Sequence, residues 1–388
     1  MISATPSSTS SVNTHYRRQL APLDMPERLL LGPGPSNSNP AVVAAMNHQP
    51  IGHLDPAYLA LMDEVQDLLR YVWQTSNELT FPVSGTGSAA MEATLANVVE
   101  PGDRVLVGVM GYFGHRLADM AQRYQADVKT IQKPWGEVFS LSELRAAIEE
   151  HRPAVLALVH AETSTGACQP LDGVGDLCRE YDCLLITDMV TSLGGVPIFL
   201  DDWNIDLAYS CSQKGLSCPP GSSPFTMGER AVEKLMRRQN KVANWYLDMA
   251  LLRQYWGSDR KYHHTAPINM TYAFREGVRL VAEEGIEQSW ARHQNTAQYL
   301  WAELAKLGLE CHVAQDHRLA PLTTVRVPAG VEAKAVTQSM LADHNIEIGN
   351  GLGELAGKVW RVGLMGHNSQ PQNVDRLISA LSQVLHKQ

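Results

Sequence analysis

The sequence has little of the material that builds disulfide frameworks, membrane spans or surfaces for nucleic acid. Its six cysteines form no CxxC pair, which favours reduced, buried thiols over disulfides or a zinc site. No apolar run approaches the roughly 18 to 20 residues of a membrane span. Acidic residues outnumber basic ones by 41 to 32, so no nucleic-acid partner is expected. Together these absences predict a cytoplasmic protein that handles small metabolites.

The N-terminal segment also lacks a targeting signal. Residues 1–26 are rich in serine and threonine and contain no apolar stretch of the kind found in secretory signals. We interpret this segment as a disordered leader or N-terminal arm.

Between residues 104 and 209, near-continuous apolar strands alternate with helical segments. This pattern predicts an α/β fold with a mostly parallel sheet covered by helices on both faces. The spacing of apolar residues predicts an amphipathic helix over 58–74 and a long helical region over 272–307 that breaks at Gly285. After residue 286 the pattern changes to short strands, one of them at 359–363, and a closing amphipathic helix. We therefore predict a large domain over 27–286 and a smaller C-terminal α+β domain over 287–388.

Lys214 is the first candidate for chemistry. It follows the apolar run 205–209 within a stretch of small polar residues and precedes Gly215. A lysine at the end of a buried strand suits a nucleophilic amine with a lowered pKa, although an ordinary loop lysine is the alternative. Asp188 ends another predicted strand. Because ligands bind beyond the carboxyl ends of such strands, both side chains are expected in one crevice.

An anion site is predicted at the turn Ser84-Gly85-Thr86. The turn precedes a helix, and the helix N-terminus offers free N–H groups and a positive dipole end. An ordinary helix cap explains the same residues. The turn does not match GxGxxG, so a dinucleotide site is not predicted. The adjacent His263 and His264 have no third ligand at suitable spacing, so no metal site is predicted.

A buried lysine, an aspartate and an anion site are the parts that pyridoxal 5′-phosphate requires. The lysine forms a Schiff base with the cofactor aldehyde. The aspartate pairs with the pyridine nitrogen and keeps it protonated. The turn at Ser84 takes the phosphate.

Longer motifs support this reading. The chain resembles the class V aminotransferases of the fold type I group, in particular the alanine–glyoxylate, serine–pyruvate and serine–glyoxylate enzymes. The resemblance spans roughly residues 29 to 385 and rests on the stretches 31–37, 84–85 with 91–93, 100–103, 160–166, 169–173, 192–195, 210–215, 262–265 and 360–363. No single stretch is decisive, but together they occur in the expected order.

The resemblance implies a role for each matched position. Lys214 is similar to the Schiff-base lysine, which also moves the proton between substrate and cofactor, and Asp188 matches the partner of the pyridine nitrogen. Around the cofactor, the resemblance places Thr163 near the phenolic oxygen, Val190 and Phe113 on the two ring faces, and Ser84, Gly85, Thr86 and Gln213 at the phosphate. Many relatives carry tryptophan where this chain has Phe113, and often serine where it has Thr163.

The substrate residues follow from the same resemblance. Arg361 matches the arginine that holds the substrate α-carboxylate, and without the resemblance a structural ion pair would be the preferred interpretation. Gly34 lies in a Gly-Pro-rich loop that fits the rim of a tight substrate pocket. Tyr262 and Thr265 resemble residues that reach the phosphate of the partner subunit, which implies a homodimer with shared active sites.

The implied reaction is a ping-pong transamination from a small amino acid, alanine or serine, to glyoxylate or pyruvate. Three alternatives remain. A cysteine desulfurase or other lyase of the family would need a loop cysteine near residues 320–350, where the chain has none. An aminoethylphosphonate–pyruvate transaminase is a second alternative. A non-catalytic scaffold is the third, and the presence of Lys214, Asp188 and Arg361 together argues against it.

Overall fold

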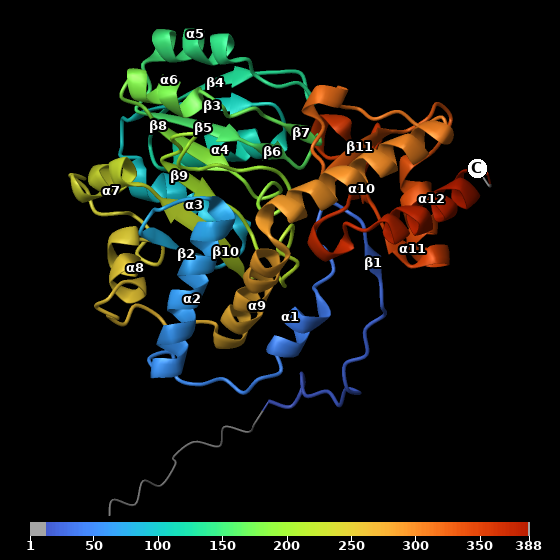
Figure 1. Ribbon diagram of the computed structural model, residues 1–388, viewed down its shortest axis with the longest axis horizontal. Helices are drawn as coiled ribbons and strands as arrows, with labels where there is room; N and C mark the ends of the chain where they lie inside the picture. Colours follow the sequence, from blue (N-terminus) through green and yellow to red (C-terminus); the bar gives the residue numbers. More distant parts are fainter. Residues whose placement is uncertain (1–12, 387–388) are drawn as a thin grey trace, which may run out of the picture.

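The computed structural model describes residues 13–386 and places a seven-stranded sheet at the centre of the larger part of the chain (Figure 1). The strand order is β2-β10-β9-β8-β5-β3-β4. The strands are β2 (Leu79–Ser84), β3 (Arg104–Val109), β4 (Asp127–Gln132), β5 (Val155–Val159), β8 (Leu184–Asp188), β9 (Leu207–Tyr209) and β10 (Ser222–Met227). Only β10 runs antiparallel to its neighbours in this sheet, so the predicted, mostly parallel sheet is confirmed.

Helices cover both faces of the sheet. Right-handed crossovers between parallel strands place α3 and α4 on one face and α5 and α6 on the other, and the two members of each pair contact each other. The helices of this part are α1 (Pro40–Ala45), α2 (Pro56–Trp73), α3 (Gly87–Val98), α4 (Tyr112–Arg123), α5 (Leu141–His151), α6 (Val174–Glu180), α7 (Glu229–Met236), α8 (Met249–Trp256) and α9 (Ile268–Glu284).

The predicted amphipathic helix over 58–74 is α2. Asp55 caps its N-terminus by accepting a 2.8 Å hydrogen bond from the Ala57 N–H, and the proline at the first helical position needs no hydrogen-bond partner. The helix ends at Gln74, which adopts a left-handed conformation with φ of 51°. Its buried face packs on α9 and β2.

The C-terminal part has its own core. Its elements are α10 (Ile286–Lys306), β11 (Leu322–Arg326), α11 (Ala333–His344), β12 (Ile346–Glu347), β13 (Gly349–Asn350), β14 (Val359–Gly363), α12 (Pro371–Leu385) and three 3₁₀ turns at Gln315–His317, Gly353–Leu355 and Gly366–Asn368. Strands β11, β14 and β13 form an antiparallel sheet. The predicted break between two long helices at Gly285 is confirmed, because α9 and α10 meet there.

The N-terminal strand β1 (Leu29–Leu30) pairs in parallel with β12. Leu31 is buried in a hydrophobic cluster with residues of α10, α11, α12 and the small sheet. The main cluster runs from Val42 to Trp290. The N-terminal strand thus lies beside the C-terminal part, while the proposed domain boundaries stay a prediction.

Of the predicted leader, residues 1–12 lie outside the described part of the chain. Residues 13–26 are exposed and contain no helix or strand. Within residues 13–386, no helix is both long and apolar enough to cross a membrane, and no group of three or more His, Cys, Asp or Glu side chains is placed to hold a metal ion.

Candidate active site

The predicted site residues gather at one edge of the central sheet. Ser84, Asp188 and Tyr209 are the last residues of β2, β8 and β9, and these strands end at the same edge because they run in the same direction. The hairpin of β6 (Ala161–Glu162) and β7 (Ala167–Cys168) lies beyond the end of the neighbouring β5. The structure therefore produces the crevice predicted from strand order.

Lys214 is buried, with 8% of its surface exposed. Its Nζ donates a hydrogen bond to the carbonyl oxygen of Pro33, and no carboxylate pairs with it in the described chain. Burial lowers the pKa of Lys214, and the charge of Arg361 acts in the same direction. The amine is thus easier to deprotonate than that of an exposed lysine.

Gly34 packs directly on Lys214. A Cβ atom at this position would lie 2.6 Å from Nζ and 2.5 Å from Cε of Lys214, and the backbone has a φ of +106°. Only glycine satisfies both requirements without strain. The predicted rim residue therefore lies against the reactive amine.

Asp188 is almost fully buried and accepts two hydrogen bonds. The backbone N–H of Val190 bonds to Oδ1 at 2.9 Å and the hydroxyl of Tyr209 bonds to Oδ2 at 2.7 Å. Burial raises the pKa of Asp188 to about 6, while these bonds and the charge of Lys214 oppose the increase. Both carboxylate oxygens are held in place, which suits a partner for a ring nitrogen.

The turn from Ser84 to Thr86 leads into α3. Thr86 is the N-cap residue but makes no side-chain capping bond, so backbone donors of the first turn are available to an anion. Gln213 lies on the neighbouring loop, where its Oε1 is buried without a hydrogen-bond partner in the described residues. A buried orphan acceptor of this kind indicates a missing partner.

Phe113 and Val190 occupy two different elements. Phe113 is the second residue of α4, and the guanidinium of Arg116 lies 4.9 Å from its ring centroid. Val190 follows β8, and its Cγ2 faces Gly87 at the start of α3. Thr163 is buried, and its hydroxyl lies 2.5 Å from that of Thr191.

The start of α4 is capped by residues from the β6–β7 hairpin rather than by its own sequence. The N-cap Gly111 has no side chain to offer. Ser164 Oγ accepts from the N–H of Tyr112 at 2.9 Å and Glu162 accepts from that of Phe113 at 3.1 Å. Burial raises the pKa of Glu162 to about 7, and the charge of Asp188 acts in the same direction. This buried carboxyl therefore fixes the helix end that carries Phe113.

Arg361 comes from β14 in the C-terminal part. Its Nε donates to the carbonyl of Asn350 at 2.8 Å and Nη1 lies 3.4 Å from the carbonyl of Thr163. Within residues 13–386 it forms no ion pair, which removes the structural ion pair considered from sequence. Burial lowers its pKa, and the charge of Glu162 opposes this. A guanidinium without a carboxylate beside the site is a ready anion receptor.

Tyr262 and Thr265 are the predicted residues that the fold does not bring to Lys214. Both are exposed, and 57% of the Tyr262 surface is accessible. Their hydroxyls lie 3.5 Å apart. They lie at the surface of the protein, whereas His264 between them contacts Ser84.

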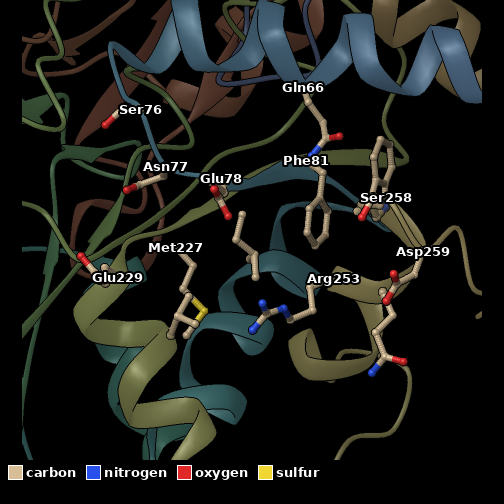
Figure 2. Close-up of a pocket in the computed structure, with 15 residues that line it drawn as sticks. Gln66, Ser76, Asn77, Glu78, Phe81, Met227, Glu229, Arg253, Ser258 and Asp259 are labelled. Atoms are coloured by element: carbon tan, nitrogen blue, oxygen red, sulfur yellow. The ribbon is translucent and has the colours of Figure 1, made fainter.

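A cavity of about 640 Å³ lies at the other edge of the sheet from Ser84, where β2 begins at Leu79 and β10 ends at Met227, beneath α2 and α8 (Figure 2). Its lining includes Gln66, Phe81, Met227 and Arg253 but none of the predicted site residues. Because its position is beyond the amino end of β2, this cavity is not the predicted crevice.

The sequence matches the family model described as "Aminotransferase class-V" over residues 29–377. The chain belongs to the class V aminotransferases. These enzymes use pyridoxal 5′-phosphate.

Three relatives show how close the resemblance is. The chain is 45% identical to an alanine–glyoxylate aminotransferase of Felis catus over 95% of this chain and 90% of that protein. The crystal structure of an alanine–glyoxylate aminotransferase from Nostoc sp. matches with 69% identity and a TM-score of 0.96, covering 97% of this chain and all of that one. A ureidoglycine–glyoxylate aminotransferase from Bacillus subtilis matches with 38% identity and a TM-score of 0.93 over 94% of both chains.

Four further residues contact the predicted site residues and were not predicted from sequence: Tyr209, Arg116, Glu162 and His264. Glu162 lies in the matched stretch 160–166, but its bond to the Phe113 N–H reaches a helix that is distant in sequence. Tyr209 directly precedes the stretch 210–215, and its bond to Asp188 joins β9 to β8. Arg116 lies one turn after Phe113 and also donates to Ser88 Oγ at 3.1 Å. His264 lies in the matched stretch 262–265, but no sequence signal links it to Ser84, which is 180 residues away.

Proposed function

We propose that this protein is a transaminase that moves the amino group of alanine or serine to glyoxylate or pyruvate. The observation that carries the proposal is the crevice itself, in which buried Lys214 and Asp188 face a free guanidinium, Arg361, from the C-terminal part. Two relatives are named for different amino donors, alanine and ureidoglycine, but both are named for glyoxylate as the second substrate. Glyoxylate is therefore the favoured acceptor.

The residues present fit pyridoxal 5′-phosphate. The uncapped start of α3 presents backbone N–H donors to a phosphate ester, and the amide N–H groups of Gln213 would add further donors. The unpartnered Oε1 of Gln213 is an acceptor and would need a donor other than the phosphate. Gly85, Thr86 and Ser84 would hold the phosphate, Asp188 the ring nitrogen, Thr163 the phenolic oxygen, and Phe113 and Val190 the ring faces. When bound, the cofactor supplies an electrophilic carbon for the amine and a ring that withdraws electrons.

Lys214 would act as the base of the reaction. Its lowered pKa leaves more of the amine neutral at neutral pH. After an incoming amino acid has displaced Lys214, Nζ would take the proton from the substrate α-carbon. It would then donate this proton to the cofactor. In the structure, the Pro33 carbonyl accepts a hydrogen bond from Nζ and so fixes the position of the amine.

Arg361 would hold the substrate α-carboxylate. Its Nε is anchored on Asn350, and Nη1 contacts the Thr163 carbonyl. The remaining N–H groups of the two terminal nitrogens would form two parallel bonds to a carboxylate. Gly34 would limit the space beside Lys214. This arrangement favours amino acids with small side chains.

We also propose a cytoplasmic homodimer with shared sites. Support comes from Tyr262 and Thr265, which are exposed. Their hydroxyls do not reach the proposed phosphate site of their own subunit and would be available to that of a partner. Exposed Trp245 and Tyr246 lie near the same loop, against His263 and His264. A partner surface would cover these rings.

The test is a single half-reaction with the purified, cofactor-loaded protein. Alanine, serine, ureidoglycine, cysteine, glutamate and aminoethylphosphonate are each added, while the visible band of the bound cofactor and the keto product are followed. We expect alanine or serine to remove the band fastest and glyoxylate to restore it. A colourless protein that takes up no pyridoxal 5′-phosphate would overturn the proposal.

The same titration addresses the alternatives. Sulfide release from cysteine would indicate a lyase, but Cys311, the cysteine nearest to the expected loop, lies in a β-bridge with Val325 and burial raises its thiol pKa. Rapid conversion by aminoethylphosphonate would indicate the phosphonate transaminase. A scaffold protein would convert none of the amino acids.

A further inference from the structure

His264 connects the surface loop 262–265 to the turn at Ser84. Its Nε2 lies 3.0 Å from Ser84 Oγ, and its Nδ1 lies 2.9 Å from Nδ1 of His263. His263 is buried and stacks on Trp245, with ring centroids 4.4 Å apart and planes inclined by 10°. The two imidazoles and the serine hydroxyl therefore form a continuous chain of hydrogen bonds.

The direction of this chain follows from the protonation of the two rings. Burial lowers the pKa of both histidines, that of His264 to about 4, so both are neutral near pH 7. Two facing Nδ1 atoms then share a single proton. If His264 held it, His263 would carry its own proton on Nε2, which is buried and has no hydrogen-bond partner in the described residues.

The opposite direction is more favourable. A buried N–H without an acceptor is rarer and costlier than a buried acceptor without a donor. His263 therefore donates from Nδ1 to Nδ1 of His264, and His264 carries its proton on Nε2. That proton points to Ser84 Oγ, which accepts it.

We propose that His264 is a positioning residue that donates to the Ser84 hydroxyl and so directs the hydroxyl proton of Ser84 to a phosphate oxygen of the cofactor. The inference rests on the proposed function, because it needs a phosphate at the Ser84 turn. In the reverse arrangement Ser84 would donate to His264, and an anion would meet a hydroxyl lone pair. Because the Ser84 oxygen accepts the His264 proton, the Ser84 hydroxyl proton is left to be donated to the phosphate.

The same bond has a consequence for the dimer. Tyr262 and Thr265, which we assign to the phosphate of the partner subunit, flank His264 on one short loop. His264 fixes that loop to the phosphate turn of its own subunit. His264 therefore links the residues proposed for one phosphate site to the turn proposed for the other.

The experiment compares two ligands that differ only in the phosphate. Cofactor is removed from the full-length protein, and dissociation constants for pyridoxal 5′-phosphate and for pyridoxal are measured by tryptophan fluorescence. For His264→Phe we expect about tenfold weaker binding of pyridoxal 5′-phosphate, equivalent to about 1.4 kcal/mol, and less than a twofold change for pyridoxal. His264→Gln, which retains an N–H donor, should recover most of the loss.

Two further variants test the route through Ser84. Ser84→Ala should weaken binding of the phosphate form by a similar factor, and the double variant should be no weaker than either single one, because both remove the same donor. His48→Phe is the matched control, since the His48 ring contacts Tyr272 and does not take part in the chain. It should bind both ligands as the unaltered protein does.

Equal losses for the two ligands, or additive losses in the double variant, would overturn the role of His264. If the variants fail to fold, ¹⁵N-histidine NMR of the unaltered protein decides the question. A proton on Nδ1 of His264 would contradict the inference, and one on Nε2 would support it. Failure of the unaltered protein to bind pyridoxal 5′-phosphate would instead overturn the proposed function.

Discussion

At the residue scale, the position of one amine depends on the absence of one methyl group. Lys214 Nζ is held by the Pro33 carbonyl, and the chain next to Pro33 passes so close to the lysine that only glycine fits at residue 34. The sequence indicates a Gly-Pro loop and a reactive lysine separately. Their contact brings together residues that are far apart in the chain.

Gly34→Ala is expected to displace Lys214 and reduce the rate of the half-reaction at least tenfold. The backbone strain of a positive φ, about 1–2 kcal/mol, would accompany this loss. Gly102→Ala is the control, because Gly102 has a φ of +86° with no atom within 4 Å of the added methyl group. Rates are measured by stopped flow, and stability by urea unfolding. Equal rate losses in both variants would show that strain alone is responsible.

Tyr209→Phe removes the hydroxyl that bonds to Asp188 Oδ2 at 2.7 Å. This bond lowers the pKa of Asp188 against the effect of burial, so its loss should raise that pKa. The reaction needs the carboxylate ionised, and the acidic limb of the kcat/KM profile should therefore move to higher pH, with about a tenfold loss of activity near pH 6.

Tyr58→Phe is the matched control for that experiment. Tyr58 is also fully buried, but its hydroxyl bonds to Thr271. This variant is expected to lose stability without a shift in the pH profile. A shift of the same size in both variants would contradict a specific role of Tyr209.

At the scale of single elements, α4 illustrates a helix start completed by tertiary contacts. Its first residues follow Gly111, which offers no side-chain cap, and the donors of Tyr112 and Phe113 bond to the β6–β7 hairpin instead. The same hairpin accepts a 2.5 Å bond from Thr324 of β11 through the Thr165 carbonyl. The hairpin thus links Phe113 to the C-terminal part.

Ser164→Ala should destabilise the protein by about 1–2 kcal/mol, because the Tyr112 N–H loses its acceptor at a partly buried helix start. Ser142→Ala is the control on an exposed helix start, where the hydroxyl only meets that of Ser140 at 3.1 Å. It should change the free energy of unfolding by less than about 0.5 kcal/mol. Urea unfolding of both variants makes the comparison, and equal effects would count against the cap.

At the scale of the whole molecule, helix α10 contacts the larger part of the chain through Ser289, whose Oγ donates to the Gly194 carbonyl at 2.7 Å. His293 of the same helix joins α10 to the 3₁₀ turn at Gly366–Asn368. Its Nδ1 lies 2.7 Å from the carbonyl of Ser289, to which it donates, and its Nε2 accepts from the Gly366 N–H at 2.8 Å. Burial lowers the pKa of His293 to about 4, with the charge of Arg292 acting in the same direction. The neutral ring is therefore part of the folded state.

Because the folded-state pKa of His293 lies below the unfolded value of about 6.5, protonation favours unfolding. Its contribution to stability is complete above pH 6.5 and is lost as the pH falls toward 4, up to about 3 kcal/mol. His293→Gln should flatten the decline of the melting temperature between pH 6.5 and 4.5. His386→Gln, at an exposed histidine, should leave the decline unchanged, and an equal slope in both variants would contradict this origin.

Shared active sites predict complementation between two inactive variants. Lys214→Ala lacks the amine, and a double variant, Tyr262→Ala with Thr265→Ala, lacks the outward hydroxyls. After joint refolding, hybrid dimers would contain one intact site, and activity should reach about a quarter of the unaltered level. The control is a mixture of Lys214→Ala and Asp188→Asn. If both residues serve the site of their own subunit, each site of the hybrid dimer keeps one of the two defects, and no site is intact. Absence of recovery in the first mixture would contradict sharing.

The order of strands and helices could be predicted because hydrophobic periodicity is a local property of the chain. The strand at Val359–Gly363 agrees with its predicted bounds, and α2 differs by two residues at its start. The predicted strand from residue 205 begins only at Leu207. Asp206 precedes it, with a carboxylate that binds the Leu185 N–H and Arg230.

The sequence alone determined the family of the chain and led to the proposal of Lys214 and Asp188 as a pair, because motif residues at strand ends carry chemistry in their type and order. Only the tertiary structure decided which residues support them. Tyr209 on Asp188, Gly34 against Lys214, the hairpin cap on α4 and His264 on Ser84 all join segments distant in sequence. Hydrogen bonds and close packing act through space, and their partners are selected when the sheet and the C-terminal part come together.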